Sequence, residues 1–460
     1  IAASPTSITA DGSSTSTITV TLLDANGNVV ADAGDVVGLA TTAGTLSGVT
    51  DNGDGTYSAT LTSATVVGSA TVSFTIDDAD ADATATVAFV AGAADTGTST
   101  IAASPTSITA DGTSTSTITV ALLDANGNVV ADAGDVVALS TTAGTLSVVT
   151  DNGDGTYAAT LTSATTVGSA TVSFTIDDAD ADATATVAFV AGTADVGTST
   201  IAASPTSITA DGTSTSTITV TLLDANGNVV ADAGGVVALS TTAGTLSGVT
   251  DNGDGTYTAV LTSATAAGSA TVSFTIDDVD ADATATVAFV PGAADVDTST
   301  IAASPTSITA NGTSTSTVTV TLLDANGNVV TDAGDVVDLA TTVGTLSAVT
   351  DNGDGTYSAE LTSATTVGSA TISFTIDDDD ATATATVAFV AGSADLGTST
   401  IGASPASITA DGTSTSTVTV TLRDAEGNAV ADAGDVVDLA TTAGTLSAVT
   451  DNGDGTYTAT

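Results

Sequence analysis

The chain repeats itself every 100 residues without an insertion or a deletion, and this period limits what it can fold into. The clearest marker is the segment Asp-Asn-Gly-Asp-Gly-Thr-Tyr at 51–57, which returns unchanged at 151, 251, 351 and 451. A repeat of this length is too long for one turn of a solenoid and has the size of a whole domain. We therefore expect four complete domains and a partial fifth, with the boundaries 1–94, 95–194, 195–294, 295–394 and 395–460.

Within each repeat, apolar residues alternate with Thr and Ser at a period of two, which is typical of half-buried strands. In the segment 15–23, for example, Ile18, Val20 and Leu22 share one side and the threonines share the other. The tandem Asn-Gly and Asp-Gly pairs of segment 51–57 predict a β-hairpin. No segment shows helical periodicity. These patterns predict a sandwich of two sheets, built from about seven short antiparallel strands.

The predicted strands of the first repeat are short and are separated by turn residues. Pro5 interrupts the first strand near an edge, and an acidic loop is expected at 77–82. The strands are expected at 1–4, 7–10, 15–23, 37–39, 44–46, 57–61, 68–76 and 83–90. The residues expected to point inward from the last three are Tyr57, Ala59, Leu61, Ala70, Val72, Phe74, Ile76, Ala85, Val87 and Phe89.

The charge balance is unusual because basic residues are almost absent. The formal net charge is −52, Arg423 is the one basic side chain, and there is no His. Such a chain has nothing with which to neutralise phosphates, so nucleic acids and anionic lipid surfaces are excluded as partners. No apolar run approaches the roughly 18 residues that suggest a membrane span, and we expect no membrane insertion in this segment.

The absence of Cys excludes disulfides and thiolate metal sites. Without His as well, zinc and most transition metals lose their usual ligands, and only hard cations that prefer oxygen remain plausible.

Several segments resemble one known family over the whole length of the repeat. Ser-Ile-Thr-Ala-Asp-Gly at 7–12, Leu-Asp-Ala-Asn-Gly-Asn-Val-Val at 23–30 and Gly-Thr-Leu-Ser at 44–47 are similar to the bacterial immunoglobulin-like repeats of invasin and intimin-type proteins. The sequence departs from the family at Val29, where Pro is usual. The resemblance implies an all-β fold class of tandem immunoglobulin-like β-sandwiches arranged as an extended rod, in the stalk of a secreted or surface-anchored bacterial adhesin.

In such a sandwich the acidic loops of one repeat share a pole with the linker from the preceding repeat. Many carboxylates without a basic partner repel one another, by ~1 kcal/mol for a pair ~4 Å apart in water. Ca²⁺, which takes carboxylate, amide and carbonyl oxygens, would relieve this repulsion and stiffen the junction. The candidate metal ligands of the second repeat are Asp95, Asp124, Asp132, Asp151, Asp154, Asp177, Asp178 and Asp180, with their equivalents 100 residues away.

The alternative to calcium is an acidic pole that is simply solvated, with diffuse Na⁺ or Mg²⁺ around it. The segment 51–57 is not an EF-hand loop, because acids are missing at its third and fifth positions and Thr62 stands where a Glu is required. Its glycines are explained by turn geometry. Exposed Thr rows could suggest ice binding or O-glycosylation, but they are also ordinary β-formers on a hydrated sheet face.

We expect no enzymatic activity. Paired carboxylates can act as a glycosidase acid and base, but the few aromatic residues of each repeat are expected in the core and leave no sugar platform. Ser and Thr have no His or Lys to serve as a base.

The function we expect is that of a spacer, which holds a binding domain away from the cell and has neighbouring repeats as its partners. The chain also reads as a slice of a longer protein, because the fifth unit lacks its last two strands. A self-assembling extracellular filament or matrix protein is the alternative, in which another copy of the chain completes that unit by strand addition. A third possibility is that the repeats bind a host ligand directly, but the sequence shows no aromatic or basic residues that could form a binding hot spot.

Overall fold

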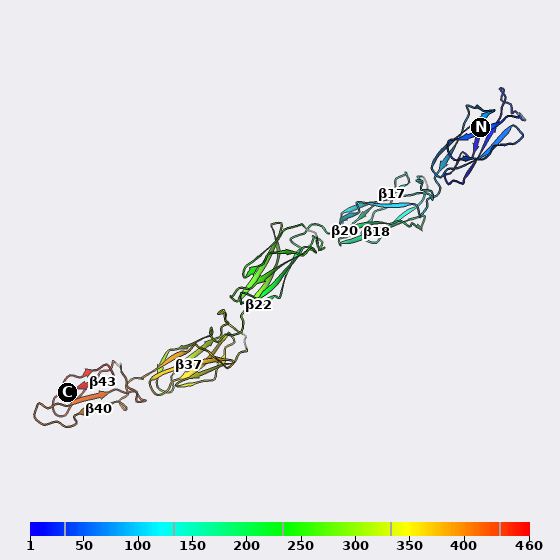
Figure 1. Ribbon diagram of the computed structural model, residues 1–460. Coiled ribbons are helices and arrows are strands. Elements are labelled where there is room, and N and C mark those ends of the chain that lie inside the picture. Colours follow the sequence, from blue (N-terminus) through cyan, green and yellow to red (C-terminus); the bar gives the residue numbers. More distant parts are fainter. Residues whose placement is uncertain (32–33, 132–133, 232–233, 332–333, 432–433) are drawn as a thin grey trace. The chain divides into compact units, whose positions relative to one another are not determined.

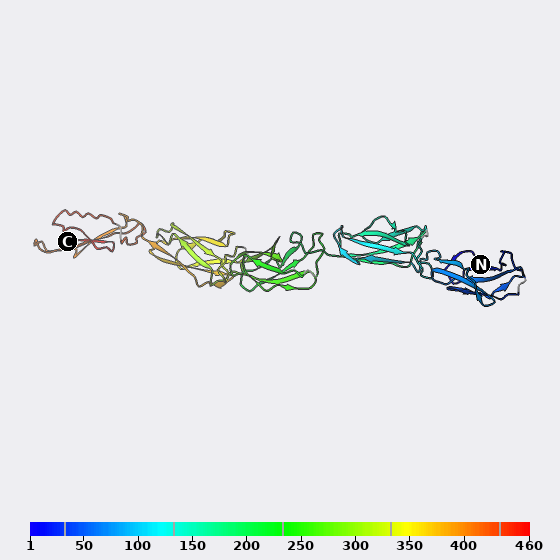
Figure 2. The ribbon, with the colours of Figure 1, turned by 90° about the horizontal axis from the view of Figure 1, so that it is seen from above.

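Alternation of apolar with Thr or Ser residues produces strands throughout, and no helix occurs in the part of the chain that is described (Figures 1 and 2). The computed structural model describes residues 1–31, 34–131, 134–231, 234–331, 334–431 and 434–460. No helix within these ranges could therefore span a membrane.

The described residues form two compact units. One contains residues 1–200, 221–235 and 253–256, and the other contains 201–220, 236–252 and 257–460. The division runs through the third repeat, so the first two repeats lie in one unit and the fourth and fifth lie in the other.

The second repeat shows the full set of strands. They are β11 (Thr100–Ser104), β12 (Ser107–Thr109), β13 (Thr115–Ala121), β14 (Val137–Thr141), β15 (Thr145–Leu146), β16 (Thr150–Asp151), β17 (Thr156–Thr162), β18 (Gly168–Ile176), β19 (Ala179–Asp180) and β20 (Ala185–Val190).

The other repeats follow the same plan. Strands β1–β10 lie 100 residues earlier, except that β1 begins at Ala2 (Ala2–Ser4), and β30–β39 (Thr300–Ser304 to Ala385–Val390) lie 200 residues later. In the third repeat, β21–β28 (Thr200–Ser204 to Gly268–Ile276) are followed by one long strand, β29 (Val279–Val290). The fifth repeat has β40 (Thr400–Ser404), β41 (Thr417–Thr421), β42 (Thr450–Asp451) and β43 (Thr456–Ala459).

Each of the first four repeats contains two sheets. In the second repeat one sheet has the order β11-β13-β17-β15, with β16 also paired to β17, and the other has the order β12-β20-β18-β14, with β19 paired to β18. The described part of the fifth repeat forms a single sheet, β40-β41-β43-β42. The all-β class and the immunoglobulin-like sandwich are confirmed.

Two details of the predicted strands are wrong. The first strand does not stay in one sheet: β11 pairs antiparallel with β13, and after Pro105 the chain crosses to the other sheet, where β12 runs parallel to β20. The sandwich is therefore not entirely antiparallel. The predicted loop at 77–82 also contains a short strand, β9 (Ala79–Asp80), because Thr75 and Ile76 extend the β8 ladder to it.

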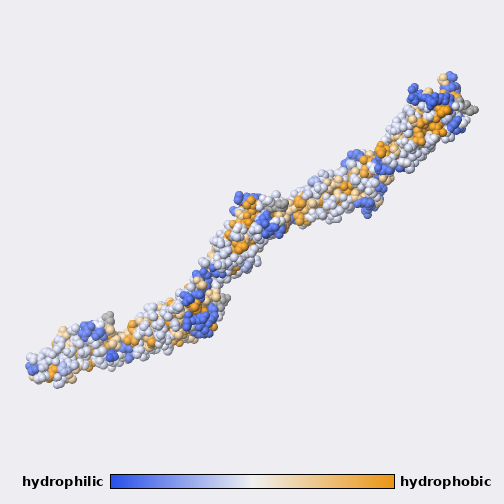
Figure 3. Space-filling view, in the orientation of Figure 1, coloured by the Kyte–Doolittle hydropathy of each residue, from blue (hydrophilic) through white to orange (hydrophobic). Residues whose placement is uncertain are grey.

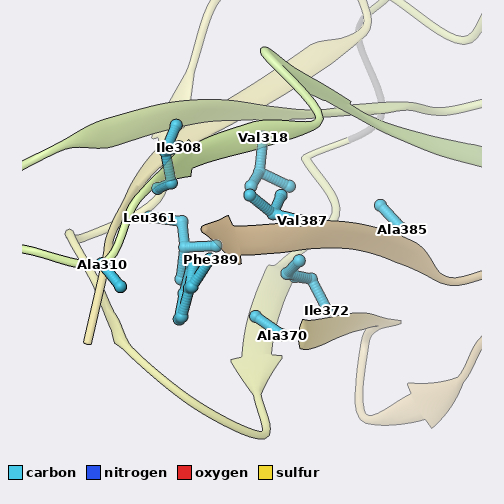
Figure 4. Close-up of a cluster of buried hydrophobic side chains, with 9 residues drawn as sticks. All are labelled: Ile308, Ala310, Val318, Leu361, Ala370, Ile372, Ala385, Val387 and Phe389. Carbon is cyan, nitrogen blue, oxygen red and sulfur yellow. The ribbon is translucent and has the colours of Figure 1, made fainter. Parts of the chain in front are cut away.

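The core lies between the two sheets and contains the residues that alternation predicted to point inward. Leu61, Ala70, Val72 and Val87 are fully buried in the first repeat, and Phe89 is 1% exposed. Figure 4 shows the corresponding cluster of the fourth repeat, in which Ile308, Leu361 and Phe389 pack together. A shift of one residue in register would have turned these side chains to solvent, so the period-two pattern was sufficient to place them.

The hairpin that marks the repeat forms as predicted. In the second repeat Thr150 pairs with Ala158 and Asp151 with Tyr157, and Gly153 and Gly155 have φ angles of 77° and 84°. A Cβ atom on Gly155 would lie 2.8 Å from the carbonyl oxygen of Val130, so only Gly permits this approach. The Gly155 carbonyl in turn accepts a hydrogen bond from the Leu122 N–H (2.9 Å). The glycines thus serve both the turn and its packing against the loop that follows β13.

Candidate junction between repeats

The residues that connect one repeat to the next are bound to the loop that follows the third strand of the next repeat. At the first junction the Asp95 N–H donates to the Leu123 carbonyl (2.8 Å), and the Thr98 hydroxyl donates to the Asp124 carbonyl (2.8 Å). The alanines of the linker, Ala91 and Ala94, pack on the core of the second repeat. The linker is therefore part of the following domain's structure.

Asp124 is the centre of this junction. Its side chain is 2% exposed, and its carboxylate accepts hydrogen bonds from the Gly92 N–H (2.9 Å), the Asn126 N–H (2.9 Å), the Asn128 N–H (2.8 Å) and the Asn128 side-chain amide (2.9 Å). Burial by itself would raise the pKa of Asp124, but these hydrogen bonds outweigh it and lower the pKa. The carboxylate is thus held ionised by backbone and amide donors, without a basic partner.

Asn128 joins this loop to the body of the preceding repeat. Its side-chain amide nitrogen donates to the Thr65 carbonyl (3.0 Å), and its side-chain oxygen accepts from the Val67 N–H (3.0 Å). One amide therefore satisfies a backbone donor and a backbone acceptor across the junction while it also binds Asp124. This two-way pairing fixes the orientation of the Asn side chain.

The same contacts recur at every described junction. Asn228 binds Thr165 (2.9 Å) and Val167 (3.0 Å), and Asn228 is itself 8% exposed. The remaining two junctions have the equivalent bonds: Asn328 to Thr265 and Ala267, and Asn428 to Thr365 and Val367.

Asp24 shows the loop without a repeat packed against it in the described chain. Its carboxylate still accepts bonds from Asn26 and Asn28, but the side chain is exposed. The hydrogen bonds within the loop are therefore the same at Asp24 and at Asp124, and the two carboxylates differ in exposure.

The structure places the predicted metal ligands in several loops of the repeat. Asp95 lies beside Asp124, but its carboxylate accepts from the Gly97 N–H (3.0 Å) and the Thr98 N–H (3.0 Å) and closes a turn. Asp154 is engaged by the N–H (3.0 Å) and the hydroxyl of Thr156 (2.5 Å). Asp178 and Asp180 are exposed, and Asp132 lies outside the described residues. No group of three or more acidic side chains in the described ranges is arranged to hold a metal ion.

Asp151 and Asp177 belong to a second acidic group, which the sequence did not define. Tyr157 donates to the Asp135 carbonyl (3.1 Å), and Asp177 accepts from the Val136 N–H (2.9 Å). Burial, followed by the charges of Asp151, Asp135 and Asp177, raises the pKa of Tyr157. Burial, the charge of Asp177 and hydrogen bonding with the Asp177 side chain raise the pKa of Asp135. Among the described residues no N–H or hydroxyl group donates to the buried Oδ2 atom of Asp135.

Figure 3 shows that strongly hydrophilic residues gather in patches on the visible face and do not cover it evenly. Sequence reasoning found these acidic loops but missed Asn126, Asn128 and Asp135. The segment Asp-Ala-Asn-Gly-Asn at 124–128 was the available signal for the asparagines, since its equivalent at 24–28 lies within a segment that resembles the family. Asp135 was not among the predicted ligands, and Gly235 stands at the equivalent position of the third repeat.

The chain matches the family described as "Invasin, domain 3" five times, over residues 1–92, 95–192, 195–292, 295–392 and 395–460. No curated protein matches it.

Similar solved structures include FdeC, an adhesin of Escherichia coli, with 27% identity, a TM-score of 0.44, and coverage of 66% of this chain and 100% of the other. Invasin, described as a bacterial integrin-binding protein, has 25% identity and a TM-score of 0.43, and the match covers 88% of this chain and 80% of invasin. InvD of Yersinia pseudotuberculosis has 24% identity and a TM-score of 0.41, covering 64% and 98%.

Proposed function

The chain belongs to the invasin domain 3 family, and from this premise we propose that it is a stalk segment of a bacterial adhesin, on the cell surface or in a secreted fibre. Its repeats would hold a binding domain away from the cell. The observation that carries the proposal is the docked linker: the residues after β10 and its equivalents are bound to the next repeat at each described junction. A linker that is bound to the following domain restrains the orientation of that domain, whereas a solvated linker would leave it free to rotate.

Negative-stain imaging of the purified chain tests the proposal. A stalk segment appears as single elongated particles whose length increases in equal steps when whole repeats are added. Lateral or end-to-end polymers at the same protein concentration would instead support a self-assembling filament, and compact particles of fixed diameter would contradict both functions.

We also propose that Ca²⁺ stiffens the junction, as the acidic composition suggests. The carboxylates of Asp95 and Asp124 are poor candidates, because backbone donors already engage them. The group around Tyr157 fits a cation better, since no N–H or hydroxyl group of the described residues donates to the buried Oδ2 atom of Asp135 and Asp177 lies close enough to raise the pKa of Asp135. A bound cation would offset the repulsion between the carboxylates of Asp135 and Asp177. Backbone carbonyl oxygens, which Ca²⁺ also takes as ligands, could complete its coordination.

Thermal melting with added Ca²⁺, with added Mg²⁺ and with EDTA tests the calcium proposal. We expect Ca²⁺ to raise the melting temperature of the second and fourth repeats, which have Asp135 and Asp335, more than that of the third, which has Gly235. An unchanged melting curve in EDTA, or an equal effect of Mg²⁺, would contradict it.

A further inference from the structure

The strand that changes sheets suggests a mechanical role for each repeat. The chain enters the second repeat through β11, crosses to the other sheet after Pro105, and continues as β12. It leaves through β20, which is the direct neighbour of β12 in the sheet. The first and last parts of the repeat are therefore hydrogen-bonded to each other, and tension that enters at β11 reaches this pair through the β11–β13 ladder.

The direction of the two strands decides how that tension acts. They are parallel, with Ser107 beside Ala188 and Thr109 beside Val190. The chain leaves where β12 ends, while it enters at the other end of β11, roughly 30 Å away at ~3.3 Å per residue. A pull on both ends of the repeat slides β12 and β20 past each other along their length, so all bonds of the ladder bear the load together.

We propose that the parallel pair of β12 and β20 is a clamp that resists unfolding of the repeat under tension. The equivalent pairs in the other complete repeats are β2 (Ser7–Thr9) with β10 (Ala85–Val90), β22 (Ser207–Thr209) with β29, and β31 (Ser307–Thr309) with β39 (Ala385–Val390). An antiparallel hairpin pulled at its open end would break one bond at a time. Here a bond beyond each end of the paired segment adds to the ladder: the Ala188 N–H donates to the Thr106 carbonyl (2.8 Å), and the Ala110 N–H donates to the Val190 carbonyl (2.8 Å).

Side chains protect this pair from water. Ile108 and Phe189 are directly opposite each other in the ladder, and they are 7% and 2% exposed. Both belong to the hydrophobic core of the repeat, as do Ile308 and Phe389 in the cluster of Figure 4. Water that could replace the strand–strand bonds one at a time is therefore excluded from one face of the clamp.

Both ends of β12 are also fastened to the opposite sheet. Before it, the Ser116 hydroxyl donates to the Pro105 carbonyl (2.6 Å). After β12, the carboxylate of Asp111 accepts hydrogen bonds from the Thr113 N–H (2.7 Å) and the Ser114 N–H (2.6 Å). It also accepts one from the hydroxyl of Ser163 (3.2 Å), the residue that follows β17. Sliding of β12 therefore requires these bonds to break along with the ladder.

The load then passes directly into the next repeat. Two residues after β20 ends, the Gly192 N–H donates to the carboxylate of Asp224 (2.9 Å), and Ala194 forms a β-bridge with Asp224. The clamp would give the proposed stalk its resistance to tension, but the inference depends on the strand pairing and not on what the chain carries.

Single-molecule force spectroscopy on the full chain tests the clamp, and the absence of Cys allows the attachment points to be chosen. The double variant Thr100→Cys with Thr200→Cys loads the second repeat from end to end, and both positions are exposed. The double variant Thr109→Cys with Val190→Cys pulls the same two strands apart from one end, so that their bonds break in sequence. Thermal melting of both variants measures whether they are equally stable, so that a difference in force can be assigned to the pulling geometry.

At the same loading rate, we expect the end-to-end variant to unfold at a severalfold higher force than the variant pulled at Thr109 and Val190. Equal forces, or the reverse order, would overturn the clamp.

If the second variant fails to fold, Asp111→Ala in the end-to-end variant provides the test, with Asp151→Ala as its control. The clamp predicts a lower unfolding force for Asp111→Ala alone, and equal forces would overturn it. Imaging tests the stalk and force tests the clamp, so either proposal can fail while the other stands.

Discussion

Two loops of each repeat have nearly the same composition, but their carboxylates differ in exposure and in hydrogen-bond partners. The segment Asp124–Asn128 and the hairpin Asp151–Tyr157 are both acidic, and both contain Asn-Gly. In the first, the carboxylate of Asp124 is 2% exposed and receives backbone and amide donors from the linker and its own loop. In the second, Asp151 and Asp154 are exposed and bind only neighbouring residues of the hairpin. What an aspartate does here is decided by the donors that surround it, because no basic residue lies nearby.

The largest difference between the loops is expected from Asp124→Ala. The substitution removes an ionised acceptor and leaves the Gly92 and Asn128 donors unpaired in a buried place, at a cost of roughly 1.5–3 kcal/mol. Calorimetry of the full chain should then show one transition, that of the second repeat, at a lower temperature. The matched control is Asp151→Ala. Equal shifts for the two variants would break the distinction between the loops.

Asn128→Ala should loosen the junction with a smaller loss of stability. It removes the bonds to Thr65 and Val67 and the bond from the Asn128 amide to Asp124, at a cost of about 1–2 kcal/mol. Amide hydrogen exchange at Val67 should become faster, since its acceptor is gone, while amides in the core of the first repeat stay protected. Asn152→Ala, in the hairpin, should leave the Val67 amide unchanged. Protection of Val67 in both variants would show that this contact does not hold the junction.

The pH dependence should have opposite signs at Asp124 and Asp135. The pKa of Asp124 is lowered in the folded state, so its stabilisation is complete above the unfolded value of about 4 and is lost as pH falls through the folded pKa. The pKa of Asp135 is raised by burial and by Asp177, so its ionised form destabilises the repeat, and this penalty disappears as pH falls through the folded pKa.

Asp135→Asn should therefore raise the melting temperature of the second repeat at pH 7, with a gain that shrinks toward pH 3. Melting curves of both proteins across this range measure the effect. A gain that is independent of pH would mean that the charge of Asp135 is not its cause.

The smallest effect is expected from Asp154→Ala. Hydrogen bonds donated by the hydroxyl and the backbone N–H of Thr156 lower the pKa of the Asp154 carboxyl group, but this group is exposed to solvent. We expect no measurable change in melting temperature or in Val67 exchange. A clear loss of stability would show that the hairpin contributes more than its turn geometry.

The sequence was sufficient for the fold class and for the core, because a period of two assigns Leu61, Val72 and Val87 to one side of their strands wherever the strands pair. It was not sufficient for the pairing of β12 with β20. Alternation is the same whether a strand stays in its sheet or crosses to the other after Pro105, and only the tertiary structure distinguishes the two.

The junction shows a similar limit. The acidic residues were visible in the sequence and suggested cation ligands, yet the partners of Asp124 are backbone N–H groups of Gly92, Asn126 and Asn128. Every residue but proline has such a group, so composition gives no hint of which ones converge on a carboxylate. The amide of Asn128 was visible, but its partners at Thr65 and Val67 lie in the preceding repeat.

The central proposal is that the docked junctions, and not the sandwiches alone, allow the chain to serve as a stalk. Small-angle X-ray scattering of the chain and of the fourfold variant Asn128→Ala, Asn228→Ala, Asn328→Ala and Asn428→Ala tests it most directly, with Asn152→Ala, Asn252→Ala, Asn352→Ala and Asn452→Ala as the matched control. We expect the native chain and the control to give the same large maximum dimension, and the junction variant to give a smaller and broader distribution of distances at unchanged secondary structure. Identical scattering from all three proteins would contradict the claim.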